Sequence, residues 1–236
     1  MSTIAWLTAR SLLGRRRVWL LIPLPALVVL LATLAEGAGV SSESWARPVI
    51  GGLGLGVLLP VIPLLVGTSV LGSEIDDGTI VYVLTKPLPR WQIVLPKLAV
   101  AIAVSATAVA VPLFVAGVVA HSVRLGGALV VAGVIGATAY AALFVALSVV
   151  TRRPVLLGLV YVLVWEGLLA KFMVGTRMLS LQQYAVALAD RIAPTPLLSG
   201  DVGVPLALAM CAVIVVGSTA VAIRRLTTFS MAGETS

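Results

Sequence analysis

The sequence predicts an all-α membrane protein with six transmembrane helices. Hydrophobic residues make up 60% of the 236 positions, charged residues only 11%, and the mean hydropathy is +1.15. Soluble domains carry about 25% charged residues. Residues 98–120 are apolar on every face, whereas a strand of a transmembrane barrel alternates polar and apolar positions over about 10 residues. Helices are therefore favoured over a barrel.

Six stretches are long enough to serve as the spans of one transmembrane domain covering residues 1–236. A helix needs about 20 mostly apolar residues to cross about 30 Å of hydrocarbon, where its backbone groups must pair within the helix. The only charged residue in any of the six is Glu166. The stretches are residues 18–35, 49–72, 98–120, 125–150, 154–170 and 202–223.

Two further segments are amphipathic rather than fully apolar. At the N-terminus, Ile4 and Leu7 alternate with Arg10, which is typical of a helix that lies in the headgroup layer and leads as an elbow into the first span. Residues 171–201, between the fifth and sixth spans, predict one or two short helices at the outer surface, which either lie on it or dip in.

The 16 Lys and Arg residues orient the chain, because cytoplasmic loops retain positive charge near the ends of spans. With the N-terminus inside, eleven lie on the inner face: Arg10, Arg15, Arg16, Arg17, Lys86, Arg90, Lys97, Arg152, Arg153, Arg224 and Arg225. The other five lie outside: Arg47, Arg124, Lys171, Arg177 and Arg191. Both termini are thus expected in the cytoplasm. The net charge of +7 then indicates topology and contact with lipid headgroups, not nucleic-acid binding, because no aromatic residues interleave the cations.

The sequence lacks the residues that disulfides, zinc sites and phosphate-binding loops require. Cys211 and His121 are the only cysteine and histidine, which excludes an internal disulfide and a zinc cluster built from such ligands. No GxxxxGK[ST] phosphate loop occurs, so no cofactor is expected on this chain. The glycine-rich residues 51–56 have no preceding strand, and their spacing favours helix packing over phosphate binding.

Residues 73–92, SEIDDGTIVYVLTKPLPRWQ, form a polar interruption between the second and third spans. Ser73 can cap a short helix whose first turn holds acidic residues, where they complement the helix dipole. An apolar surface follows, and the two prolines of KPLPR end any helix. A short loop has no core of its own, so exposed apolar residues indicate a docking partner. The alternative is a solvated hairpin with capping acids.

The spacing of this loop resembles that of the membrane subunits of type-2 ABC exporters. The matching order is Glu74, Gly78, Thr79, Leu84, Pro87, Arg90 and Lys97. In that family the loop forms a coupling helix that docks on the ATP-binding subunit. The basic N-terminus, six spans and outer helical segment resemble the family as well. Two departures are Pro96, where glycine is common, and the acidic pair Asp76–Asp77, where many members carry a basic residue.

The resemblance implies a permease subunit of an ATP-driven exporter in a bacterial plasma membrane, and not an enzyme. A separate ATPase dimer would carry ATP and Mg, and a second copy or a sister permease would complete the pathway. Membrane lipids are the remaining expected partner. Drug, lipid, peptide and glycan cargoes all stay open. The residues implied in coupling are Glu74, Asp76, Asp77, Gly78, Thr79, Ile80, Val83, Leu84, Pro87 and Arg90.

Glu166 is the candidate residue within the membrane. It lies 12 positions after Pro154, about 18 Å along a helix at 1.5 Å per residue. An ionisable residue at that depth is a functional candidate. We expect it to line the pathway, to be protonated, or to pair with Lys171 or with a Tyr hydroxyl on a neighbouring helix.

Two other functions compete with the permease interpretation. An intramembrane lipid-modifying enzyme needs an activated nucleophile or metal ligands. An ATPase-independent secondary transporter is expected to show inverted repeats and several charged residues within its spans. The sequence shows neither pattern.

Overall fold

The computed structural model describes residues 21–76, 89–170, 178–198, 200 and 202–232. This part of the chain is a helical bundle, in which the only β contact is an isolated bridge between Thr195 and Leu198. Four helical stretches are long and apolar enough to cross a membrane: Ser42–Gly72, Trp91–Ala120, Val123–Val150 and Val204–Thr227. Pro23–Gly37 and Pro154–Leu169 are shorter apolar helices. The predicted helical membrane fold is confirmed, and the exact layout of six spans stays a prediction.

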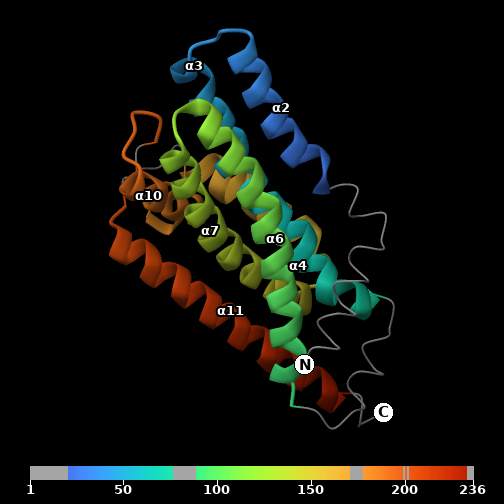
Figure 1. Cartoon of the computed structure of the whole chain (residues 1–236). Coiled ribbons are helices and arrows are strands. Elements are labelled where there is room, and N and C mark those ends of the chain that lie inside the picture. The colour runs from blue at the N-terminus through green and yellow to red at the C-terminus, as the bar shows by residue number, and fades with distance from the viewer. Residues whose placement is uncertain (1–20, 77–88, 171–177, 199, 201, 233–236) are drawn as a thin grey trace.

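Figure 1 shows the helices of the described residues gathered into one bundle. They are α2 (Pro23–Gly37), α3 (Ser42–Ala46), η2 (Arg47–Leu58), α4 (Leu59–Asp76), α6 (Trp91–Ala120), α7 (Val123–Val150), α8 (Pro154–Val160), η3 (Tyr161–Leu169), α10 (Leu181–Ile192) and α11 (Val204–Ala232). Two of them, η2 and η3, are π-helical, with bonds such as Leu59 N–H to the Gly54 carbonyl, five positions back. Such segments are rare and occur often at functional sites.

Helix α7 forms the centre of the bundle and packs against α4, α6, α10 and α11. Its Tyr140 and Phe144 are fully buried, as are Leu59 and Ile62 of α4. By contrast, α2 and α11 lie at the periphery (Figure 1). The side chains at the centre of the bundle therefore come mainly from α7 and from the helices that pack against it.

The turn between α6 and α7 brings the two backbones into close contact. The hydroxyl of Ser122 accepts a hydrogen bond from Leu125 N–H at 3.2 Å and caps α7. A Cβ atom on Gly117 would lie 2.8 Å from Cα of Gly126. Only glycine at these positions permits so close an approach of the two helices.

The helices extend beyond the apolar stretches of the sequence. Helix α6 begins at Trp91, seven positions before residue 98, and includes Pro96 within it. The second helical stretch begins at Ser42 because Trp45 and Ala46 bury against the bundle. The last helix continues to Ala232. Hydropathy detects the hydrocarbon crossing, whereas polar residues at an interface can continue a helix past it.

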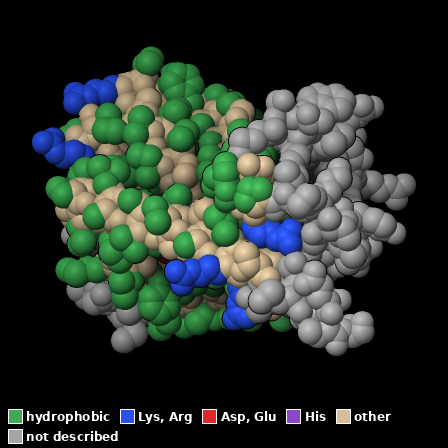
Figure 2. Space-filling view, turned by 90° about the horizontal axis from the view of Figure 1, so that it is seen from below, with side chains coloured by type: hydrophobic (Ala, Val, Ile, Leu, Met, Phe, Trp, Pro, Cys, Tyr) green, Lys and Arg blue, Asp and Glu red, His purple; other side chains and the backbone are tan. Residues whose placement is uncertain are grey.

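Large apolar side chains are exposed around the bundle. Leu163 is 67% exposed and Val216 is 69% exposed. On the face that Figure 2 draws, hydrophobic side chains cover most of the described surface, with Lys or Arg at a few places and no acidic side chain among the described residues. A lipid environment accounts for such a surface, because hydrocarbon solvates apolar side chains at no cost.

Helix α10 agrees with the alternative in which the outer helical segment dips into the protein. Seven of its 12 residues are buried, and it packs against α7, α11 and η2. A turn of 3₁₀ helix at residues 178–179 precedes it. Helix α10 therefore lies within the bundle instead of covering it.

Candidate functional site

Most of the predicted coupling residues lie outside the described part of the chain. This holds for Asp77, Gly78, Thr79, Ile80, Val83, Leu84 and Pro87. The backbone at Glu74 and Asp76 forms the last turn of α4, and their side chains are also outside the described residues. The predicted N-cap at Ser73 is therefore wrong, because the second membrane helix continues through Ser73 instead of ending before it. Arg90 is the N-cap of α6, and its carbonyl accepts hydrogen bonds from Ile93 N–H and Val94 N–H, both at 3.1 Å.

The two helices that flank the loop, α4 and α6, contact each other. Lys97, only 2% exposed, places Nζ 3.5 Å from the Val70 carbonyl of α4. The end of α4, the start of α6 and the end of α11 lie at the same end of the bundle (Figure 1). The two helix ends that flank residues 77–88 thus lie at the end of the bundle where α11 finishes.

Glu166, on η3, forms a polar cluster in the apolar interior. Its side chain is 2% exposed. Carboxylate oxygen Oε1 accepts hydrogen bonds from Tyr140 OH at 2.8 Å, Leu181 N–H at 3.0 Å and Tyr161 OH at 3.2 Å. Oxygen Oε2 accepts one from the Ser180 hydroxyl. A carboxylate offers about four acceptor positions, so these four donors provide the partners that burial of such a group requires.

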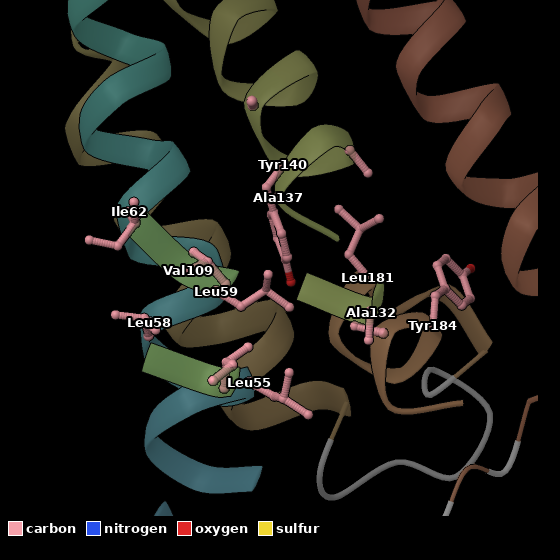
Figure 3. Packing of buried hydrophobic residues seen from close by; sticks show 14 of the residues in the cluster. Leu55, Leu58, Leu59, Ile62, Val109, Ala132, Ala137, Tyr140, Leu181 and Tyr184 are labelled. Atoms are coloured by element: carbon pink, nitrogen blue, oxygen red, sulfur yellow. The ribbon is translucent and has the colours of Figure 1, made fainter. Parts of the chain in front are cut away.

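Aromatic packing holds the two tyrosine hydroxyls in place. The ring of Tyr140 stacks on Phe144 with centroids 5.9 Å apart, and Tyr161 meets the same Phe144 edge-on at 6.4 Å. In Figure 3 the Tyr140 side chain points from α7 toward Leu181 at the start of α10. Both hydroxyls consequently approach Glu166 from rings that have little freedom to rotate.

Both ends of α10 are capped by groups of suitable charge. Ser180 accepts a hydrogen bond from Gln183 N–H at 3.2 Å and donates to Glu166. The Glu166 carboxylate also accepts from Leu181 N–H, the first of the helix. At the other end, Arg124 Nε donates to the Ile192 carbonyl at 3.0 Å. An anion at the N-terminus and a cation at the C-terminus both complement the helix dipole.

Three contacts fix α10 alongside one part of α7. Glu166 joins Tyr140 to the start of α10, a Cβ atom on Gly136 would lie 3.5 Å from Ala185 Cβ, and Arg124 contacts the far end. Arg124 and Tyr140 are 16 positions apart on the 28-residue α7, or about 24 Å at 1.5 Å per residue. The N-terminus of α10 therefore lies more than halfway along α7 from its Val123 end. Helix α10 is a half-helix that starts deep inside the bundle.

The π-helical η2 supports the same half-helix from another side. Gln182 Nε2 lies 3.4 Å from the Gly51 carbonyl, and a Cβ atom on Gly56 would come within 3.3 Å of that Gln182 amide. Gly54 packs against Leu113 of α6. This glycine-rich segment thus serves helix packing. The close contacts are made at Gly54 and Gly56, and nothing lies within 4 Å of a Cβ atom built on Gly52.

An open apolar groove of about 520 Å³ lies between α2 and α6. Its lining includes Pro25, Val29 and Pro112, and its Thr33 hydroxyl bonds within α2 to the Val29 carbonyl at 2.9 Å. The groove offers no directed polar contact from these residues. Across the described residues, no group of three or more His, Cys, Asp or Glu side chains could hold a metal ion.

The sequence anticipated part of the Glu166 cluster. A tyrosine hydroxyl on a neighbouring helix was one of the expected partners, and Tyr140 of α7 fills that position. Tyr161, on the same helix as Glu166, is a second partner that was not expected, and Lys171 lies outside the described residues. The roles of Ser180 and of the Leu181 N–H were not foreseen. Their signal was the Ser-x-x-Gln spacing of Ser180 and Gln183, which is typical of a helix N-terminus. Whether Glu166 lines a pathway stays a prediction.

Comparison with known families supports the resemblance carried by the loop. The family described as ABC-2 family transporter protein matches residues 13–176. The match covers more than half of the 236 residues and includes the loop, α7 and Glu166, and it ends before α10. Comparison with curated proteins gives no match. By this family match and its long apolar helices, the chain is a multi-pass membrane protein that belongs to the ABC-2 family of transporter proteins.

Proposed function

We propose that this chain is the permease subunit of an ATP-driven exporter, and that residues 73–92 dock on a separate ATP-binding subunit. Membership in the ABC-2 family is the observation that carries the proposal. The absence of a phosphate loop from the sequence supports it, because the energy of ATP must then enter through another chain.

The docking surface combines acidic and apolar residues. Glu74, Asp76 and Asp77 precede the apolar residues of the loop, and the contact between Lys97 and Val70 supports the base from which the loop leaves the bundle. Binding of the apolar residues by a partner removes them from water. Motion of the ATPase then reaches α4 and α6 directly, since both helices end at the loop.

On this proposal each permease chain forms half of the translocation pathway. A second copy or a sister permease supplies the other half, an ATPase dimer supplies ATP and Mg, and lipids cover the apolar faces. The positive-inside rule supports a cytoplasmic location for the loop and both termini, and a bacterial plasma membrane is part of the same proposal. Residues Gly78, Thr79, Pro87 and Arg90 shape the loop, and Ile80, Val83 and Leu84 provide its apolar contacts.

Copurification tests the docking proposal. We expect the tagged chain, extracted in mild detergent from its own host, to retain a protein that mass spectrometry identifies by a GxxxxGK[ST] loop. Replacing Ile80, Val83 and Leu84 together by Asp should remove that protein. The matched control is Val40→Asp with Val123→Asp, two exposed apolar residues away from the loop, at 44% and 67% exposure, which should leave the complex intact.

Two results would contradict the proposal. One is an ATPase that stays bound at unchanged stoichiometry in the triple Asp variant. The other is transport or lipid turnover by the purified chain alone in liposomes, which would favour a secondary transporter or a lipid-modifying enzyme.

Glu166 as a pathway residue is a separate part of the proposal. Its side chain is 2% exposed within the single chain, so contact with cargo requires the surrounding cluster to open. On this proposal Glu166→Gln changes transport while assembly with the ATPase is retained. Unchanged export at normal expression would remove Glu166 from the pathway.

A further inference from the structure

We propose that Glu166 is a positioning residue that anchors the half-helix α10 inside the bundle, so that α10, α7 and η3 form one rigid unit. This anchoring role does not depend on the proposed exporter function. It rests on the donors that converge on the carboxylate and on the depth at which α10 begins.

A helix that begins inside a membrane protein has a specific problem. Its first N–H groups have no partners within the helix, and water cannot supply them in a hydrocarbon environment. In α10 the Leu181 N–H donates to Glu166, and the Gln183 N–H donates to Ser180, which in turn donates to Glu166. The carboxylate thus satisfies the buried terminus both directly and through the capping serine.

Three of the four donors to Glu166 come from other helices, and the fourth, Tyr161, lies five positions before it on η3. Tyr140 belongs to α7, Tyr161 to η3, and Ser180 and Leu181 to the start of α10. Removing the carboxylate would leave several buried donors without an acceptor at once. Because a buried polar network is costly when only partly satisfied, the four groups are expected to separate together or not at all.

The far end of α10 is fixed as well. Arg124 Nε binds the Ile192 carbonyl at 3.0 Å, and Ala185, in the middle of the helix, faces Gly136 of α7. The half-helix is therefore held at its two ends by charges and in its middle by close packing. This arrangement leaves α10 no independent hinge along its contact with α7.

The anchor also distinguishes α10 from a ligand-binding half-helix. In transporters with broken helices, a half-helix N-terminus directed into the protein can bind anionic groups of a substrate. Here two of the N-terminal N–H groups, those of Leu181 and Gln183, already have protein acceptors. An external anion would have to displace the Glu166 carboxylate from these N–H groups and would be repelled by its negative charge.

Thiol accessibility tests the anchor without an ATPase or a cargo. In a Cys211→Ala background, which removes the only cysteine, Ala185→Cys places a thiol at a position that is 1% exposed, opposite Gly136. The thiol reacts with N-ethylmaleimide only when α10 opens, so the labelling rate reports the open fraction. We expect the additional change Glu166→Gln to raise that rate about tenfold or more, because hydrogen bonds to charged groups are the strong ones.

Two sets of variants complete the test. Tyr140→Phe removes one donor to Glu166, and Ser180→Ala removes a donor to Glu166 together with the acceptor of the Gln183 N–H; each should raise the rate several-fold. The exposed carboxylate of Glu43 provides the matched control, and Glu43→Gln should leave the rate unchanged. Labelling is compared on protein that elutes as one peak in size-exclusion chromatography.

Specific outcomes would overturn the anchor. They are an unchanged rate in Glu166→Gln, or labelling of the unaltered Ala185→Cys background as fast as a cysteine at the exposed Val123. If Glu166→Gln does not accumulate, the donor variants decide, and an unchanged rate in both refutes the proposal. The labelling assay does not measure transport. A result that refutes the anchor therefore leaves the exporter proposal standing, and a result that refutes the exporter proposal leaves the anchor standing.

Discussion

Tyr140→Phe isolates one hydrogen bond of the Glu166 cluster. The substitution removes the donor that lies 2.8 Å from Oε1 and keeps the fully buried ring and its stacking on Phe144. Hydrogen bonds to charged groups contribute about 1.5 to 3 kcal/mol in soluble proteins. Between membrane helices the average is about 0.6 kcal/mol and the maximum about 1.7, because the unfolded chain in the membrane also finds partners.

These limits set the expected magnitude. Full burial and a carboxylate acceptor place Tyr140 near the upper end of the membrane range, so we expect Tyr140→Phe to lower the free energy of unfolding by about 1.5 kcal/mol. Tyr161 donates over a longer distance, 3.2 Å, and is only half-buried. Tyr161→Phe should therefore cost less, about 0.5 kcal/mol.

Reversible unfolding in mixed micelles, with increasing mole fraction of SDS, measures both values. A double-mutant cycle then assigns the loss to the pair: in a Glu166→Gln background, Tyr140→Phe should lose less stability than in the unaltered chain. The reasoning is refuted if Tyr140→Phe costs less than Tyr161→Phe, or if its cost is the same in both backgrounds.

Three further substitutions probe packing and helix capping. Gly117→Val should lower the free energy of unfolding by about 2 kcal/mol or more, since its Cβ would lie 2.8 Å from Gly126 Cα and the backbones must separate. Gly127→Ala, with nothing within 4 Å of the added Cβ, should instead raise stability by about 0.5 to 1 kcal/mol; equal effects in the same SDS titration would contradict the close approach. Arg124→Gln removes a cation from the Ile192 end of α10 and should cost about 0.5 kcal/mol, and an unchanged SDS midpoint would show that this contact contributes nothing.

Hydropathy was sufficient to predict the long helices of this protein. An uninterrupted apolar run has few stable alternatives in a membrane, because every backbone group must pair within its segment. The ends of the helices were less accessible to this reasoning. Trp91 starts α6 before the apolar stretch, and Pro96 is tolerated within it, since the cost of one missing hydrogen bond depends on neighbours that a sequence does not display.

The position of α10 could not be read from its composition. Its amphipathic pattern fits a helix at a surface as well as one between α7 and α11. Glu166 was recognisable as a buried acid, but its partners Tyr140 and Ser180 lie 26 and 14 residues away, and only the fold brings them together. The capping pattern of Ser180 and Gln183 marked the start of the helix and carried no information on its depth.

The coupling loop illustrates a different limit. The prediction that Ser73 caps a new helix is wrong, because α4 continues through Ser73 to Asp76 and the acids Glu74 and Asp76 lie in its last turn. Burial against a partner is the proposed reason for the apolar residues after Gly78. The ATPase was inferred as that partner from the order of loop residues that this chain shares with type-2 ABC exporters. The family match shows that the chain belongs to the ABC-2 family and gives no information on docking. Docking remains a proposal that requires direct measurement.

Site-specific photocrosslinking in native membranes tests the central claim most directly. A photoreactive amino acid in place of Val83 should form an adduct with a protein that carries a GxxxxGK[ST] loop, identified by mass spectrometry. The same group at Val123, beside the α6–α7 turn, should give no such adduct. Crosslinking of the ATP-binding protein from Val123, or its absence from Val83 at normal expression, would contradict docking through this loop.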